Sequence, residues 1–258
     1  MPDQGADDPA DNPAYGWEGA PGTGHELGPG FLARSQLVER WLSKLRPASA
    51  LEVGCGRGNL TARVARHCGR FVAFDISPEA GRIARAKCSD IAGVDVVLAA
   101  IDALPFRERF DAVILAEVLE HLDNDAGALE RAIDLLADGG HVIVTVPAHQ
   151  SMWTEQDDAA GHKRRYARDE IRALMERGGL AVLELVSWGF PITRQLVLRG
   201  GSAAAGYRRE GRAKLPAAIR FARSLYAPLA RPVARLEYLL SGLDRGVGYA
   251  LLARRSQS

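Results

Sequence analysis

The sequence predicts an α/β fold, a doubly wound sheet with helices on both faces, and three observations carry this prediction. Short apolar segments alternate with segments of helical spacing between residues 49 and 188. The apolar segments are continuous, which is typical of parallel strands that are buried on both faces. A glycine-rich turn follows the first of these segments, where a tight strand-to-helix connection needs it.

The first half of the chain supplies most of the elements. Residues 1–27 are rich in Pro, Gly and Asp and are expected to be a disordered acidic segment, whereas residues 28–258 form one domain. Helical periodicity runs from Phe31 to Leu45 and ends before Pro47. The expected strands are Ala50–Val53, Arg70–Phe74, Asp95–Ala99, Ala112–Ala116 and His141–Val146. The expected helices are Asn59–His67, Pro78–Cys88 and about Asp125–Ala137, the last closed by Gly139-Gly140.

The second half adds a helix at about Arg168–Arg177 and strands at Ala181–Trp188 and Gly248–Ala253. Between these two strands lies an insertion of about residues 191–245. It is expected to form two or three helices, broken at Gly200-Gly201, Pro216, Pro228 and Pro232. If the last two strands pair, the insertion is a helical cap on the edge of the sheet.

Composition excludes several classes of protein. The three cysteines lack CxxC spacing, which argues against a disulfide scaffold or zinc ribbon and favours a reducing, cytoplasmic location. No apolar stretch reaches the roughly 18 residues of a membrane span, and no secretory signal is visible.

Charge is unevenly distributed along the chain. The first 33 residues hold six acids and no Lys or Arg, whereas residues 191–258 hold 13 basic residues and three acids. This basic end suits an anionic partner or a solvated surface. Residues 215–243 interleave leucines with arginines, so they either lie on anionic lipid, as a peripheral membrane contact, or pack on the sheet edge.

Acidic residues follow the predicted strands at the positions where a nucleoside ligand would need them. Glu52 precedes the glycines Gly54, Gly56 and Gly58, and this spacing suits a cationic amino-acid ligand better than a pyrophosphate. Asp75 closes the second strand, where a carboxylate accepts hydrogen bonds from ribose hydroxyls. Asp102 follows the third strand and is placed to accept from an adenine amino group.

In this order and spacing the motifs resemble those of the class I S-adenosylmethionine-dependent methyltransferases, over about Ser49–Gly189 plus the last strand. The resemblance implies a seven-stranded mixed sheet whose last strand is antiparallel. It also implies a cofactor site. The cofactor-binding residues would be Glu52, Gly54, Gly56, Gly58, Asp75, Ile76, Asp102, Ala103 and Glu117.

The segment Glu117-x-x-Glu120-His121 follows the fourth strand. In a helical turn these three side chains would share one face. Together with His162 they are similar to the pattern of ubiquinone-biosynthesis O-methyltransferases and plant small-RNA 2′-O-methyltransferases, which implies a Mg²⁺, Mn²⁺ or Zn²⁺ site. The alternative is a metal-free site in which His121 or His162 is the catalytic base and Glu117 lines the cofactor pocket.

A long polar segment, residues 147–166, follows the fifth strand, where loops commonly carry function. It is similar to a bacterial methyltransferase subgroup with a Trp…Asp…Gly-His-x-Arg-Arg-Tyr segment. Candidate substrate contacts are His149, Trp153, Arg164, Arg165 and Tyr166. The alternative for Arg164, Arg165 and Tyr166 is helix packing and surface ion pairs.

These observations favour a methyltransferase with a small-molecule or lipid-linked acceptor, and O-methylation over N- or C-methylation. An oxygen acceptor must lose a proton, so O-methylation calls for a base or a metal ion near the cofactor. Two alternatives stay open. One is an RNA methyltransferase that uses the basic end, although that end lacks the interleaved aromatic residues of a stacking surface. The other is a non-catalytic binding protein with the same fold.

Overall fold

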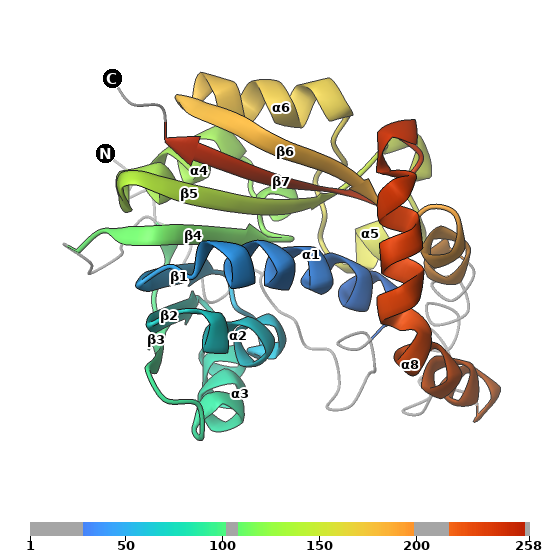
Figure 1. Cartoon of the computed structure of the whole chain (residues 1–258), viewed down its shortest axis with the longest axis horizontal. Helices are drawn as coiled ribbons and strands as arrows, with labels where there is room; N and C mark the ends of the chain where they lie inside the picture. The colour runs from blue at the N-terminus through green and yellow to red at the C-terminus, as the bar shows by residue number, and fades with distance from the viewer. Residues whose placement is uncertain (1–27, 102–107, 199–216, 256–258) are drawn as a thin grey trace, which may run out of the picture.

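The computed structural model describes residues 28–101, 108–198 and 217–255, and its centre is a seven-stranded sheet (Figure 1). The strand order is β3-β2-β1-β4-β5-β7-β6. Strands β1 to β5 run parallel, and β7 is antiparallel to both β5 and β6. The strands are β1 Ser49–Val53, β2 Arg70–Asp75, β3 Val94–Leu98, β4 Phe110–Ala116, β5 Leu136–Pro147, β6 Leu180–Trp188 and β7 Gly248–Arg255. The mixed doubly wound sheet with an antiparallel last strand is therefore confirmed.

Helices cover both faces of the sheet and bury two apolar cores (Figure 1). One core packs α4 and α6 against the sheet, and the other packs α1, α2 and α3 against the opposite face. The longer helices are α1 Pro29–Leu45, α2 Asn59–Val64, α3 Pro78–Cys88, α4 Asp125–Asp134, α5 Glu155–Ala159, α6 Arg168–Arg177 and α8 Ala217–Leu239. Short 3₁₀ turns are η3 Ala65–His67, η5 Leu119–His121, η6 Gln150–Met152 and η7 Ser241–Leu243.

The strand order creates the place where a ligand can bind. Strand β1 pairs with β2 on one side and with β4 on the other, so the chain reverses direction across the sheet at β1 and β4. The connections that leave their carboxyl ends diverge to opposite faces, and a crevice forms there in open α/β sheets. The glycine turn after β1 and the acidic residues after β2 and β4 all lie at this edge.

Two expectations about helix ends are wrong. Gly139 and Gly140 do not close a helix, because α4 ends at Asp134 and both glycines lie inside the longer β5. The insertion is not broken at Pro228 or Pro232, because α8 runs through both of them. The proposed breaks at Gly200-Gly201 and Pro216, like residues 1–27, lie outside the described residues.

The insertion between β6 and β7 packs on the rest of the fold through α8 and a short helix at residues 192–198. Tyr238 of α8 donates from its hydroxyl to Glu184 of β6, and the guanidinium of Arg40 in α1 lies 4.0 Å from the Tyr238 ring. The insertion is thus anchored at the β6 edge of the sheet. Among the helices of the described ranges, none has the length and apolar character that crossing a bilayer requires.

Candidate functional site

The turn after β1 is shaped by glycines whose backbone few other residues would adopt. Gly56 and Gly58 have φ of 52° and 71°, in the left-handed region. A Cβ on Gly58 would lie 2.9 Å from Cα of Ala84 in α3, so the turn must approach α3 closely. A Cβ on Gly56 would meet nothing within 4 Å. The turn therefore presents bare backbone to an open space beside it.

Asp75 at the end of β2 binds this turn directly. One of its carboxylate oxygens accepts from the backbone N–H of Gly56 at 2.7 Å, and the other accepts from the N–H of Ser77 at 2.9 Å. Each carboxylate oxygen has a second lone pair for a ligand. Asp75 is thus held at the crevice in the position expected for a ribose-binding acid, with Ile76 next to it and half-buried.

Glu52 lies beneath the turn, 2% exposed, and accepts from the Thr61 hydroxyl at 2.6 Å. Burial raises the pKa of Glu52 to about 8, a shift that the Thr61 hydrogen bond opposes and the charge of Asp75 supports. Glu52 is therefore protonated at neutral pH in the cofactor-free protein. A cation bound beside it would favour the carboxylate. Asp102, the predicted adenine-contacting acid, and Ala103, a predicted cofactor-binding residue, lie outside the described residues.

Glu117, directly after β4, does not sit in a helical turn. Its φ is 59°, and only Leu119–His121 form a 3₁₀ turn. Its carboxylate accepts from the Thr145 hydroxyl at 3.0 Å and lies 3.9 Å from the Arg34 guanidinium. The expected helical turn over Glu117, Glu120 and His121 does not form, and Glu117 contacts Thr145 and Arg34, although its charge still acts on Glu120 and His121.

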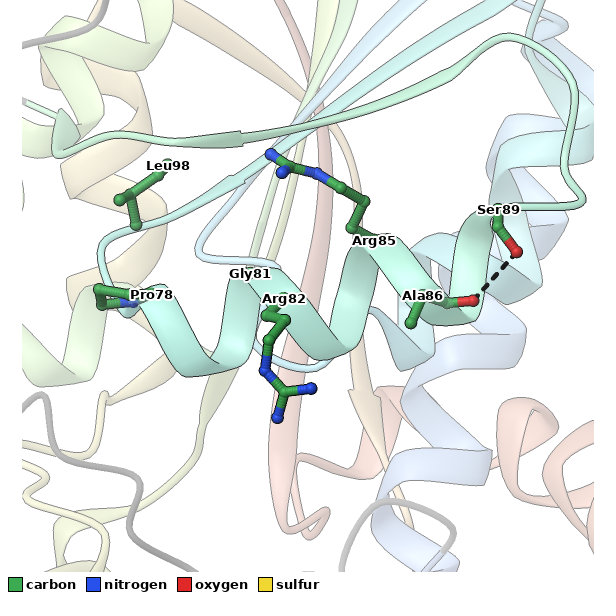
Figure 2. A pocket seen from close by; sticks show the side chains of 7 residues that line it. All are labelled: Pro78, Gly81, Arg82, Arg85, Ala86, Ser89 and Leu98. Carbon is green, nitrogen blue, oxygen red and sulfur yellow. Dashed lines mark hydrogen bonds between the residues drawn. The ribbon is translucent and has the colours of Figure 1, made fainter.

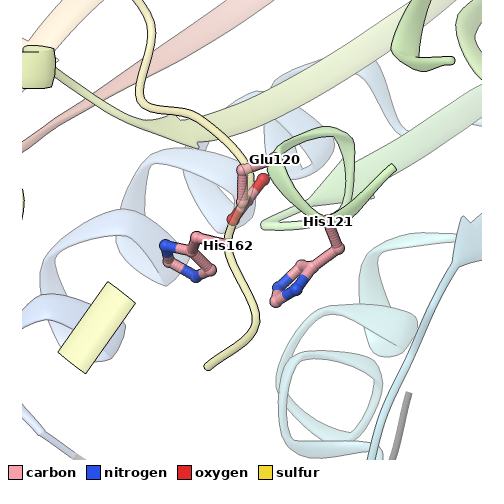
Figure 3. Close-up of side chains that lie close together, drawn as sticks. All are labelled: Glu120, His121 and His162. Atoms are coloured by element: carbon pink, nitrogen blue, oxygen red, sulfur yellow. The ribbon is translucent and has the colours of Figure 1, made fainter. Parts of the chain in front are cut away.

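Glu120, His121 and His162 do come together (Figure 3), with candidate ligand atoms that all lie within 4.8 Å of one another. The two imidazole rings meet edge to face at 4.8 Å between centroids. The Glu120 side chain is fully buried, and among the described residues neither of its carboxylate oxygens has a side-chain hydrogen-bond partner. Burial and the nearby charge of Glu117 raise the pKa of Glu120 well above its ordinary value. Burial and the charge of His162 lower the pKa of His121 to about 4. Such an unsatisfied carboxylate is costly unless a cation or proton compensates it.

Asp157 in α5 fixes His162, and the sequence reasoning missed it. It is 1% exposed and accepts from Nδ1 of His162 at 2.8 Å and from both ends of the Arg165 guanidinium at 2.9 and 3.0 Å. Although burial opposes it, these hydrogen bonds hold the pKa of Asp157 far below its usual range. Nδ1 of His162 therefore carries the proton, which leaves Nε2 free as a base or ligand. The Thr154-x-x-Asp157 spacing of a capping box was the available signal for this residue.

The other candidate substrate residues have intramolecular partners. Tyr166 is fully buried and donates to Asp125, so it forms no wall of an open pocket. Arg164 pairs with Asp125 and donates to two backbone carbonyls, and Arg165 is held by Asp157. For these three residues the contacts match the packing alternative.

His149 and Trp153 remain partly accessible. The indole N–H of Trp153 donates to Asp158. His149 has a φ of 59° and lies edge-on to the Tyr249 ring, with its Nε2 4.0 Å from Asp244. Backbone strain of this kind clusters at functional sites, so His149 stays a candidate for acceptor contact.

A separate cavity of about 420 Å³ lies between α3 and the end of β3 (Figure 2). Its lining comes from α3 and Leu98, including Arg82 and Arg85, and contains none of the predicted site residues. Leu98 of β3 is the β-sheet partner of Asp75 of β2, the predicted ribose-binding acid, so this cavity lies beside the β2–β3 strand pair. It is distinct from the Glu120–His121–His162 cluster.

Comparison with known proteins identifies the family to which this chain belongs. A family model described as "Methyltransferase domain" matches residues 31–185. Nodulation protein S of Rhizobium tropici is 35% identical over 99 residues, 37% of this chain and 42% of that protein. Ubiquinone biosynthesis O-methyltransferase of Alkalilimnicola ehrlichii is 32% identical over 123 residues, 46% of this chain and 48% of that protein. The chain thus spans about half the length of the curated relatives it matches.

One solved structure shows the likeness of fold at low sequence identity. It is that of a putative sarcosine dimethylglycine methyltransferase from Galdieria sulphuraria, with a TM-score of 0.59 at 14% identity. The match covers 88% of this chain and 85% of that one. At such identity it supports the fold alone.

Proposed function

The chain belongs to the class I S-adenosylmethionine-dependent methyltransferase family, and from this premise we propose that it methylates an oxygen of a small-molecule or lipid-linked acceptor. The observation that carries the proposal is the histidine pair beside the crevice, one member of which is held by Asp157 with its Nε2 free. Oxygen acceptors need a group that removes or stabilises a proton, whereas a neutral amine acceptor does not.

The residues of the crevice fit S-adenosylmethionine. The open side of Gly56 leaves room for a ligand against bare backbone, which a Cβ would occupy. Asp75, already aligned by the N–H groups of Gly56 and Ser77, offers its remaining lone pairs to the ribose hydroxyls. Glu52 supplies a carboxyl group beneath the turn for the ammonium end of the cofactor.

Methyl transfer is an in-line displacement. The acceptor oxygen forms a bond to the methyl carbon while the bond from that carbon to the sulfonium sulfur breaks, and sulfur takes the electron pair. The protein mainly positions the two reactants. In the metal-free form of the proposal, Nε2 of His162 takes the hydroxyl proton. Asp157 keeps the opposite nitrogen protonated and stabilises the imidazolium that results.

A divalent ion fits the same residues. Glu120, His121 and His162 offer one carboxylate oxygen and two imidazole nitrogens, and the buried Glu120 carboxylate has no other partner. Asp157 would then orient His162 as an outer partner of a metal ligand. When bound, the ion lowers the pKa of an acceptor hydroxyl and fixes its direction. Glu117, the fourth expected ligand, is engaged by Thr145 and Arg34 instead.

The first experiment screens for the acceptor. Purified protein is incubated with S-adenosylmethionine and a panel of metabolites and lipid extracts, and products that gain one methyl group are sought by mass spectrometry. Transfer to a hydroxyl supports the proposal. Transfer only to nitrogen or carbon would exclude O-methylation, and no cofactor binding in calorimetry would exclude methyl transfer altogether.

The second experiment separates the metal from the metal-free base. Metal content of the purified protein and its melting temperature with and without Mg²⁺, Mn²⁺ or Zn²⁺ are measured for the wild type, Glu120→Ala and His162→Ala. Equal loss of bound metal and of its thermal effect in both variants supports the ion. His67→Ala is a matched control because His67 pairs with Glu39, outside the cluster. An absence of metal in the wild type, together with full activity in a chelator, identifies His162 or His121 as a base.

A further inference from the structure

The helical insertion leaves an apolar stripe on its outer side. Leu229, Leu236 and Leu239 of α8, followed by Leu243 of η7, are 56%, 53%, 78% and 54% exposed. Their spacing of seven, three and four residues places them on one side of a helix. Leucines exposed in such a row are unusual on a monomer surface and indicate an interaction site.

The charges beside this stripe are all positive in the described part of α8. Arg231 and Arg235 are exposed in the same stretch of the helix, and helical spacing places Arg235 next to Leu239 and Arg231 beyond it. Glu237, the acidic residue of this helix, is 2% exposed and turned inward, where it accepts from the backbone N–H and the hydroxyl of Thr193 at 2.6 and 2.8 Å. We call the surface formed by Leu229, Arg231, Arg235, Leu236, Leu239 and Leu243 the cap face.

In the described part of the chain, the contacts that attach the insertion lie away from the cap face. The opposite side of α8 holds the contacts that attach the insertion, through buried Ala230, through Glu237 and through Tyr238 with Glu184 and Arg40. Removing a leucine of the cap face would expose no core. The leucines of the stripe therefore do not contribute to packing in the described part of the fold. Because exposed apolar surface is unfavourable in water, their exposure needs another explanation.

The cap face also lies at the functional end of the molecule. Figure 1 shows α8 at the end of the sheet where β6 stops and β7 begins, and α8 packs on α1 and β6. Because β6 runs in the same direction as β4 and β5, this is the edge that carries the glycine turn and the histidine cluster. A surface bound to the cap face would thus lie next to the crevice.

We propose that the cap face docks on an anionic lipid bilayer. Arginines beside a row of leucines match the negative headgroups and the apolar interior of such a surface, and a helix that lies flat buries only one side. A second copy of this chain fits less well, because a two-fold contact would set arginines against arginines. Because the cap face lies at the same end of the sheet as the crevice, docking would bring the crevice close to the lipid and would favour an acceptor carried by lipid. This consequence alone rests on the proposed function.

The test is co-sedimentation of the full chain with vesicles of phosphatidylcholine alone and of phosphatidylcholine mixed equally with phosphatidylglycerol, at low and high salt. The variants are Leu236→Asp/Leu239→Asp and Arg231→Glu/Arg235→Glu. Leu183→Asp is the matched control, because Leu183 is 55% exposed on β6, away from the cap face. Circular dichroism checks the folding of each variant, and calorimetry checks its binding of S-adenosylmethionine.

We expect the wild type and Leu183→Asp to sediment with anionic vesicles, less so at high salt, and both double variants to partition about tenfold more weakly or worse. A wild type that stays in the supernatant with anionic vesicles at low salt overturns the proposal. So do double variants that are folded yet sediment like the wild type, or equal binding to neutral vesicles. Because cofactor binding is measured separately, a wild type that binds S-adenosylmethionine but no vesicles refutes docking alone, whereas a wild type that binds vesicles but not the cofactor refutes the proposed function alone.

Discussion

Replacement of Glu52 by Gln tests the electrostatics under the glycine turn. In the folded protein burial raises the pKa of Glu52 from 4.5 to about 8, so the folded state holds a proton that the unfolded chain releases above pH 4.5. For an acid whose folded-state pKa is raised, stability is fully present below the unfolded pKa and is lost as the pH rises toward the folded one. The variant Glu52→Gln keeps the shape and can still accept from Thr61, but it has no proton to lose.

The magnitude follows from the linkage between proton binding and folding. One extra proton in the folded state makes the free energy of unfolding fall by about 1.4 kcal/mol per pH unit within this window, or roughly 2–3 kcal/mol between pH 5 and pH 7. For a chain of this size that corresponds to about 5–10 °C in melting temperature. Relative to wild type, Glu52→Gln should therefore gain about this much stability over the same interval.

The assay is thermal unfolding of cofactor-free wild type, Glu52→Gln and Glu130→Gln across this pH range. Glu130 is an exposed glutamate of α4, so its variant should follow the wild-type curve. Parallel curves for wild type and Glu52→Gln would refute the argument, since they would show that Glu52 is ionised in the folded protein.

Three further outcomes are expected. Asp75→Ala removes the carboxylate that aligns the turn and should weaken S-adenosylmethionine binding by about 1.5–3 kcal/mol in calorimetry, and unchanged affinity would remove Asp75 from the cofactor site. Gly58→Val should destabilise the fold by more than about 2 kcal/mol in urea, because its Cβ meets Ala84 at positive φ. Gly56→Val is strained by its positive φ but meets no neighbour, so it should cost less stability than Gly58→Val and should abolish cofactor binding; equal effects of the two on stability would contradict this division. Asp157→Asn should cost about 3–5 kcal/mol at pH 7, since it leaves the largely buried guanidinium of Arg165 without its carboxylate. The difference should shrink as the pH falls below 3.8, because the unfolded wild-type chain then takes up a proton that the folded carboxylate, with its lowered pKa, does not, and a pH-independent difference would argue against an ion pair.

Much of the cofactor half of the site follows from local sequence pattern. A buried strand is a continuous apolar run, and a turn at positive φ calls for glycine, so β1, Gly56 and Gly58 can be located without any knowledge of distant contacts. Asp75 follows because the carboxyl ends of parallel strands share one edge of the sheet. The seven strands and the antiparallel β7 were implied by the family resemblance rather than by periodicity, and the structure confirms both, whereas the strand order emerged only from the tertiary structure.

The acceptor half depended on contacts between residues far apart in the chain. Asp157 and Arg165 are typical surface residue types, and only the return of their loop to β5, where Ala148 bridges to Tyr166, buries them as a pair. The helical spacing of Glu117 and Glu120 suggested one helical turn, but the left-handed backbone at Glu117 leaves this residue outside the 3₁₀ turn that carries Glu120.

The insertion shows the same division between local and tertiary information. Its composition predicted a basic, amphipathic, helical segment. Its prolines predicted breaks that α8 does not have, since local propensity yields to the packing of one face against α1 and β6. The sequence by itself thus determined which residue types surround the crevice and in what order they occur. The tertiary structure decided which of them face a ligand and which neutralise one another, because burial and ion pairing depend on neighbours that no local pattern encodes.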